Sequence, residues 1–111
     1  MYFLDYYGPA DLYLQVRESL AQELAGAFRA GPEAAHVRRV VIEDPQPEIE
    51  IWVELSSEEQ LVRLGRDIAA RLSGVVRAAS PLDVWVMFRI VPLSHAFLNG
   101  EPRGRAGSWL E

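Results

Sequence analysis

The sequence contains no cysteine, no lysine and no threonine, and these absences narrow the chemistry available to the chain. Without cysteine there is no thiol nucleophile, no disulfide and no thiolate metal site. Without lysine there is no Schiff-base chemistry, and every one of the 11 basic residues is an arginine. The two histidines, His36 and His95, lie far apart and form no metal-binding pair. We therefore expect neither a metal site nor a cofactor.

Positive charge is also scarce. The formal net charge is -5, from 11 basic and 16 acidic residues. Nucleic acids and anionic membranes both select clustered positive charge, so neither is an expected partner. The N-terminal stretch 1–8 is too short for a membrane span and carries Asp5, which argues against a signal peptide and a membrane anchor. The interpretation is a cytoplasmic protein.

The length and apolar content predict a single domain. The chain has 111 residues, of which 50% are hydrophobic, so residues 1–111 suffice for one domain with its own core. A domain of this size is only marginally stable alone, and we expect it to form a homo-oligomer.

The chain repeats itself at an offset of 48 residues. The stretch 23–30 reads ELAGAFRA and the stretch 71–78 reads RLSGVVRA, so leucine, glycine, arginine and alanine recur at matching positions. Such a pattern is typical of a duplicated β-α-β unit. We assign the units to 2–44 and 49–92 and a tail to 93–111. A unit of about 50 residues buries too little surface to fold alone, so both units must share one sheet.

The first unit is predicted to be a strand, a helix and a strand. Residues 2–7 are rich in aromatic side chains and indicate the first strand. Apolar positions between 11 and about 30 follow a helical period, and Gly31-Pro32 is expected to end that helix. Residues 36–43 alternate in the manner of a second strand.

The second unit has the same order of elements. Residues 48–55 alternate apolar and mostly acidic side chains, as a strand with one buried face does. The sequence from Ser56 to Glu59 matches a capping box that starts the second helix. Residues 83–91 are apolar on both faces, which predicts a central strand, and Asn99-Gly100 in the tail predicts a tight hairpin.

The expected fold is therefore α+β, with the element order β-α-β-β-α-β and a C-terminal hairpin. Right-handed crossovers place both helices on one face of a four-stranded mixed sheet and leave the other face uncovered. That open face would display Trp52, Trp85, Met87 and Val91. An apolar patch of this kind requires a partner surface or a ligand.

This arrangement resembles the tautomerase superfamily, which includes macrophage migration inhibitory factor (MIF) and oxalocrotonate tautomerase. The resemblance is strongest to an uncharacterised bacterial branch whose last strand ends in an aromatic-x-Asn-Gly-Glu tail. The residues 83–86 followed by 96–101, DVWV and AFLNGE, match that pattern. The resemblance implies a homotrimer in which three open sheet faces line a central barrel.

In this family an N-terminal proline, exposed after removal of the initiator methionine, acts as the general base of keto-enol tautomerisation. Desolvation lowers the proton affinity of such an amine and makes it a base near neutral pH. Position 2 of this chain is Tyr2, and a bulky second residue normally causes Met1 to be retained. The sequence therefore predicts a homotrimer without the proline-dependent reaction, a pseudoenzyme. If an isomerase activity remains, the candidate catalytic residues are Met1, Tyr2 and His95.

The resemblance also suggests a pocket for a small carboxylate or enol ligand. Trp85 falls where the family places a pocket-lining tyrosine, and Met87 replaces a polar residue. Arg38 and Arg39 lie on the second strand, where a guanidinium can hold a carboxylate with two hydrogen bonds. The simpler interpretation is that Trp85 and Met87 pack against a neighbouring subunit. The two arginines would then pair with the acidic face of the third strand, at Glu48, Glu50 and Glu54.

A second hypothesis keeps the order of elements and changes the pairing of the strands. A ferredoxin-like module has the same β-α-β-β-α-β string and would form a dimer that binds a small regulatory ligand. A third hypothesis, an active isomerase, needs a pocket that the sequence does not define. Asp5 is notable in every case, because a carboxylate within an aromatic strand must reach solvent, an arginine or a functional site.

Overall fold

The computed structural model describes residues 1–102. The final residues 103–111, including Trp109 and the end of the predicted tail, lie outside this description. The elements in chain order are β1 (Tyr2–Tyr7), α1 (Ala10–Ala27), η1 (Pro32–Ala34), β2 (Ala35–Arg39), β3 (Ile49–Leu55), α2 (Glu58–Ala79), β4 (Val84–Ile90), η2 (Leu93–His95), β5 (Phe97–Leu98) and β6 (Glu101–Pro102).

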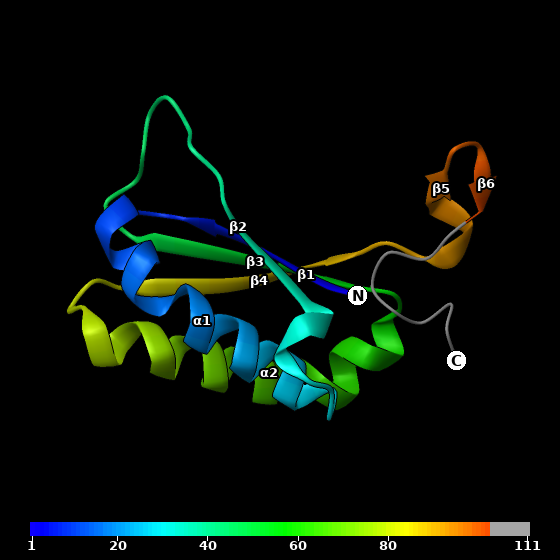
Figure 1. Ribbon diagram of the computed structural model, residues 1–111, viewed down its shortest axis with the longest axis horizontal. Coiled ribbons are helices and arrows are strands. Elements are labelled where there is room, and N and C mark those ends of the chain that lie inside the picture. Colours follow the sequence, from blue (N-terminus) through cyan, green and yellow to red (C-terminus); the bar gives the residue numbers. More distant parts are fainter. Residues whose placement is uncertain (103–111) are drawn as a thin grey trace.

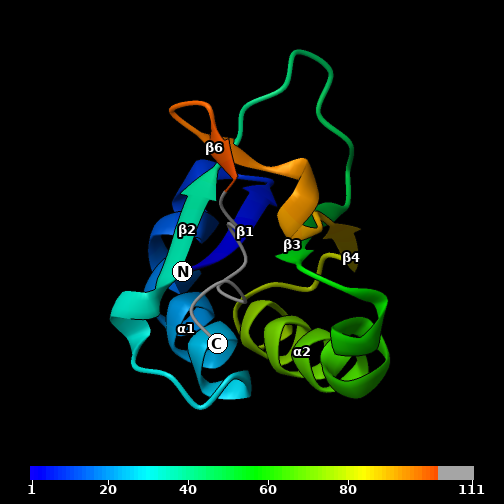
Figure 2. The same ribbon diagram turned by 90° about the vertical axis from the view of Figure 1, so that its right-hand side faces the viewer.

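The four long strands form one mixed sheet in the order β2-β1-β3-β4. Within each unit the strands are parallel, β1 with β2 and β3 with β4, and the units meet through the antiparallel pair β1 and β3. Both helices cover one face of the sheet and lie side by side (Figures 1 and 2). The predicted α+β architecture is confirmed. The ferredoxin-like pairing is wrong, because that fold separates the two strands of a β-α-β unit, whereas here they are neighbours.

The core lies between the sheet and the helix layer. Alternate residues of β3 (Ile49, Ile51, Val53 and Leu55) are fully buried, as the alternation predicts. Each helix adds a buried stripe, including Leu20 and Leu24 of α1 and Ile68 and Leu72 of α2. The helix faces differ from the prediction at a few positions. Leu12 and Val76 are buried, whereas Tyr13 and Val75 are only partly buried.

The ends of the helices differ from the prediction. Helix α1 ends at Ala27 rather than near Ala30, in a Schellman arrangement in which the Arg29 and Ala30 N–H groups donate to the carbonyl oxygens of Gly26 and Ala25. Helix α2 begins one residue later than predicted. Ser57 is the N-cap residue, and its side chain accepts a hydrogen bond from the Gln60 N–H.

Side-chain geometry explains this later start. The side chain of Gln60 turns back to accept hydrogen bonds from the backbone N–H and the hydroxyl of Ser56, both at 2.8 Å. The predicted partner Glu59 is exposed and instead forms an ion pair with Arg63. Ser57 and Gln60 also have the spacing of a capping box, and Ser57 caps the Gln60 N–H, while the Gln60 side chain accepts from Ser56.

Both edge strands also depart from expectation. Strand β2 ends at Arg39, four residues before the predicted end, because its neighbour β1 ends at Tyr7 and offers no further pairing. Strand β4 was predicted to be central but lies at the edge. Its second apolar face belongs to the uncovered side of the sheet, where the exposed fraction of Trp85 is 59%.

The C-terminal hairpin is confirmed. Strands β5 and β6 pair through Asn99 and Gly100, whose φ angles of 55° and 84° are those of a tight type I′ turn. Figure 1 shows the hairpin at one end of the sheet, clear of the helices and raised toward the open face. The side chains of Phe97 and Leu98 are exposed to 64% and 58%, so the body of the described chain leaves them largely uncovered.

Candidate functional site

The open face of the sheet is the first candidate site. Alternation and register place on it Phe3, Asp5, Tyr7, His36, Arg38, Glu50, Trp52, Glu54, Trp85, Met87 and Arg89. Three of the four predicted ligand-binding residues, Arg38, Trp85 and Met87, are therefore on one face. Arg38 and Trp85 stand on opposite edge strands, β2 and β4, with β1 and β3 between them.

Asp5 forms the centre of this face. Its side chain is only 9% exposed, and it lies between two arginines from the two edge strands. Arg38 donates from Nε to Oδ1 and from Nη2 to Oδ2, at 2.5 and 3.3 Å, and Arg89 donates to Oδ2 at 3.2 Å. Burial by itself raises the pKa of the Asp5 carboxyl, but the hydrogen bonds and charges of the two arginines outweigh it. The pKa of Asp5 is therefore lowered, and its carboxylate stays charged near neutral pH.

Aromatic side chains surround this ionic centre. The guanidinium carbon of Arg89 lies 4.5 Å from the centre of the Trp52 ring, a cation–π contact. The Trp52 indole N–H donates to Glu50 at 3.2 Å, and the Phe3 and His36 rings are 5.4 Å apart. Trp85 remains 59% exposed and Met87 is partly buried. The face thus combines a fixed charge network with uncovered apolar surface.

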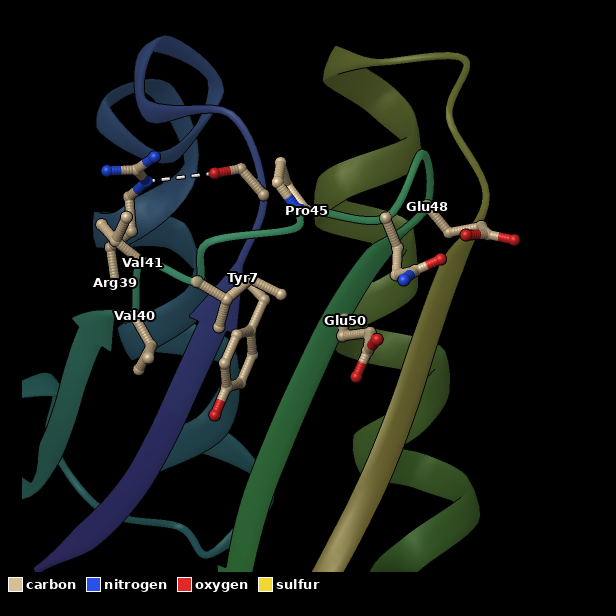
Figure 3. Close-up of a pocket in the computed structure, with 10 residues that line it drawn as sticks. Tyr7, Arg39, Val40, Val41, Pro45, Glu48 and Glu50 are labelled. Atoms are coloured by element: carbon tan, nitrogen blue, oxygen red, sulfur yellow. Dashed lines mark hydrogen bonds between the residues drawn. The ribbon is translucent and has the colours of Figure 1, made fainter.

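Arg39 belongs to a different place. Its side chain leaves the sheet on the opposite side from that of Arg38, and its Nε donates to the Gly8 carbonyl oxygen at 3.0 Å. It lines a pocket of about 130 Å³ beside the 40–48 loop, together with Tyr7 and Glu50 (Figure 3). In Figure 3 the guanidinium turns toward the connection between β1 and α1. The structure therefore does not bring the two predicted arginines together.

The two arginines were expected to pair with the acidic face of β3, but strand β1 lies between β2 and β3. Arg38 donates hydrogen bonds to Asp5 of β1, and Arg39 donates to the Gly8 carbonyl oxygen. Asp5 raises the pKa of the Arg38 guanidinium, and the nearby charge of Glu54 raises it further. The expectation that Asp5 must reach an arginine is confirmed. Arg89 was missed as a member of the site, and the only signal for it was that it is the single charge in an otherwise apolar strand.

The three candidate catalytic residues lie at one end of the sheet. Strand β1 begins where the antiparallel β3 and the adjoining β4 end, so Met1, Tyr2 and His95 share this end. The Tyr2 ring faces the helices and stacks on Phe28, with centroids 4.0 Å apart and planes 8° from parallel. Met1 is 46% exposed, and His95 is exposed on η2. The structure thus uses the Tyr2 side chain for packing.

Within residues 1–102, no helix is long and apolar enough to cross a membrane. In the same residues, no group of three or more histidine, aspartate or glutamate side chains is arranged to hold a metal ion.

Comparison with known proteins gives the fold. No family model matches the sequence, and neither does any curated protein. A domain of unknown function from Sebaldella termitidis is 14% identical, covering 90% of this chain and 97% of that one, with a TM-score of 0.69. A fused 4-OT, described as a symmetric trimer, is 16% identical, covering 96% and 98%, with a TM-score of 0.67.

A MIF-like protein from Entamoeba histolytica is 6% identical, covering 90% of this chain and 95% of that one, with a TM-score of 0.65. The chain therefore has the fold of the tautomerase superfamily. The resemblance expected from the sequence is confirmed at the level of the fold.

Proposed function

We propose that this chain is a tautomerase-fold protein that assembles as a homotrimer through its open sheet face and lacks the proline-dependent keto-enol reaction. One observation supports this most: the sheet has a helix layer on one side, and on the other side it exposes Trp85 and leaves Phe3, Trp52 and Met87 only partly buried. Apolar surface of this kind marks an interaction site. A second copy of the chain is the partner we infer, since the similar fused 4-OT is described as a trimer.

The elements that flank the open face support the same assembly. The hairpin and the 40–48 loop both rise on the side of the sheet opposite the helices, at its two ends (Figure 1). Each carries exposed apolar side chains, Phe97 and Leu98 on the hairpin and Val41 and Ile42 on the loop, with Val41 72% exposed. In a ring of identical subunits these side chains can contact the next copy and become buried.

The proposal of lost chemistry rests on the start of the chain. Tyr2 stands where the resemblance places the catalytic proline, and its ring is committed to the stack on Phe28. A retained Met1 would put a primary amine one residue away from the position of the family's base. We therefore propose a binding role, with Arg38, Trp85 and Met87 forming part of a site for a small carboxylate or enol.

Substitution of Trp85 tests the assembly. We expect the wild-type chain to have three times the monomer mass in light scattering, and Trp85→Asp to shift it to the monomer because a charge cannot be buried in that interface. Val62, which is 88% exposed on α2, provides the matched control. Val62→Asp should remain a trimer. Equal masses for the two variants would contradict assembly through the open face.

A Tyr2→Pro variant tests the proposed loss of activity. Proline is tolerated at the first residue of a strand, and removal of Met1 before it would restore the secondary amine. We expect the processed trimeric variant to gain keto-enol activity on a phenylpyruvate-like enol, while Tyr2→Ala does not. A processed and trimeric Tyr2→Pro protein without activity would show that the pocket is absent as well as the base.

A further inference from the structure

A groove on the helix layer lies on the opposite side of the sheet from the open face, and the proposed function assigns it no ligand although Tyr2 is part of its lining. Its lining comes from the end of α1, from α2 and from Tyr2 at the start of β1. Figure 2 shows the two helices side by side below the start of β1. The volume of the groove is about 590 Å³, within the range of pockets that hold small molecules. Three arginines line it, Arg29, Arg63 and Arg71, against one acidic lining residue, Asp67.

Arg29 is the most unusual of these arginines. Its φ angle is 57°, in the left-handed region where a helix end usually has glycine. An L-residue other than asparagine or aspartate is uncommon there, and the conformation costs about 1 kcal/mol. Its side chain is exposed, and within residues 1–102 no ion pair or hydrogen bond of its guanidinium is found. The chain therefore keeps an available cation at a position where glycine would fit better.

The other two arginines are held in exposed ion pairs. Arg63 pairs with Glu59 at 3.0 Å, and Arg71 pairs with Asp67 at 3.0 Å and with Glu23 at 3.3 Å. All these side chains are at least 36% exposed, and pairs of that kind contribute little to stability. A dianion that enters the groove can therefore take hydrogen bonds from both guanidiniums at small cost to the fold.

One side of the groove is apolar. Phe28 and Tyr2, stacked on each other, form part of its lining, and Leu64 contributes from α2. Gly26 also lines the groove, and its lack of a side chain leaves room for the Arg71 guanidinium, because a Cβ there would lie 3.1 Å from Nη1 of Arg71. The groove thus offers cationic donors next to an aromatic and aliphatic surface.

We propose that this groove binds a small organic phosphate, with the phosphate held by Arg29, Arg63 and Arg71 and the carbon skeleton against Phe28 and Leu64. Arginine is suited to this role because its planar guanidinium donates two parallel hydrogen bonds to phosphate oxygens. A groove lined by three arginines and one acidic residue contrasts with the net charge of -5 of the whole chain. The ligand binds on the helix side and does not depend on assembly through the sheet.

Calorimetric titration with phenyl phosphate tests the proposal directly. We expect saturable binding of one molecule per chain, and binding of inorganic phosphate several-fold weaker because it lacks the apolar part. Phenol, which lacks the phosphate, should show no saturable binding. Absence of saturable phenyl phosphate binding, or equal affinity for inorganic phosphate, would overturn the proposal.

The internal repeat supplies a matched pair of variants. Arg29→Gly removes the guanidinium and also relieves the left-handed strain, so the variant should fold at least as well as the wild type. It should bind phenyl phosphate about tenfold to a hundredfold more weakly, the loss expected for one charged hydrogen bond. Arg77, the equivalent arginine of the second unit, lies outside the groove and pairs with Asp83 at 3.7 Å. Arg77→Ala should bind within twofold of the wild type.

Equal weakening by Arg29→Gly and Arg77→Ala would show that general charge, not the groove, attracts the phosphate, and would overturn the assignment. The mass of each variant separates this result from the proposed assembly. A monomer that still binds phenyl phosphate contradicts the trimer and leaves the groove intact. A trimer that does not bind it contradicts the groove alone.

Discussion

The two β-α-β units place equivalent leucines in one core, yet their helices end differently. Leu24 and Leu72 are both fully buried. Helix α1 stops at Ala27 and leaves Arg29 in a left-handed turn, whereas α2 continues to Ala79 and keeps Arg77 helical. The residues before the prolines, Gly31 and Ser80, are extended in both units, as a following proline requires. A repeated sequence thus preserves packing while its helix ends diverge.

The edge strands also differ between the units. The open side of β2 carries charge, with Arg38 paired to the buried Asp5, whereas that of β4 carries the exposed Trp85 and the partly buried Met87. The first unit therefore supplies a fixed ionic centre and the second supplies apolar surface. Arg89 connects them, since it leaves β4 to reach Asp5 on β1. The two units thus share one sheet and supply different side chains to its open face, charged in the first and mainly apolar in the second.

Alanine at the equivalent core leucines should have the largest effect. Leu24→Ala and Leu72→Ala each remove a fully buried side chain, which costs about 2–5 kcal/mol of unfolding free energy. We expect the two variants to lose similar amounts of unfolding free energy, which chemical denaturation measures. Leu14, 62% exposed on α1, is the control, and Leu14→Ala should change stability by less than about 0.5 kcal/mol. A loss at only one of the core leucines would mean that the units contribute unequally to the core.

The second unit has no buried tyrosine equivalent to Tyr6. Tyr6 should make the stability of the fold depend on pH at high pH. Burial raises the pKa of its phenol to about 12 from 10.0, and the hydroxyl donates to the Pro9 carbonyl oxygen at 3.0 Å. The unfolded chain ionises first, so stability is complete below pH 10 and falls as the pH rises toward 12. Two pKa units correspond to about 2.7 kcal/mol. Chemical denaturation between pH 10 and 12 measures this loss of unfolding free energy. The wild type should show the loss, and Tyr6→Phe should not.

Asp5→Asn should lower the unfolding free energy by about 1 kcal/mol, because Arg38 and Arg89 then lose their shared carboxylate. The effect stays small because both arginine side chains are partly exposed to water. The lowered pKa of Asp5 sets the pH dependence. Its contribution is present above the ordinary aspartate pKa of 3.8 and is lost as the pH falls through the lower folded value. The gap in unfolding free energy between wild type and variant should therefore narrow in acid. A constant gap down to pH 2 would contradict the ionic role.

Most of the architecture could be predicted from the sequence, and the reasons are local. Alternation in residues 49–55 and the Asn99-Gly100 pair each determine one structure through backbone geometry. The predictions failed in two situations. In the first, two adjacent residues can each cap the same helix, as Ser56 and Ser57 can before α2. In the second, the length or position of a strand depends on a strand that is distant in the sequence. The length of β2 depends on where β1 ends, and the edge position of β4 depends on strand order.

The candidate site was less predictable for the same reason. The open face was expected, and Trp85 is indeed exposed on it. Alternation along β2 places Arg38 and Arg39 on opposite faces of the sheet. Which residue Arg38 binds depends on which strand lies next to β2, and that strand is β1 with Asp5. The contact of Arg89 with Asp5 spans 84 residues, and no local pattern reports it.

The smallest expected effect compares the equivalent glycines. Gly74→Ala should raise the unfolding free energy by about 0.5–1 kcal/mol, because alanine is the better helix former and, outside the backbone of α2 and the adjoining residues, nothing in residues 1–102 lies within 4 Å of the added Cβ. Gly26→Ala should gain less, since its Cβ would press on the Arg71 guanidinium at 3.1 Å. Thermal unfolding of both variants checks the order. A larger gain at Gly26 would mean that Arg71 does not lie over α1 in solution.

The mass of the unmodified chain in dilute solution decides between a trimer that buries the open sheet face and a monomer that exposes it. We expect about three times the 12.5 kDa of one chain at micromolar concentration, with tryptophan fluorescence typical of a buried ring. A 12.5 kDa species with solvent-exposed tryptophan would contradict assembly through the open sheet face.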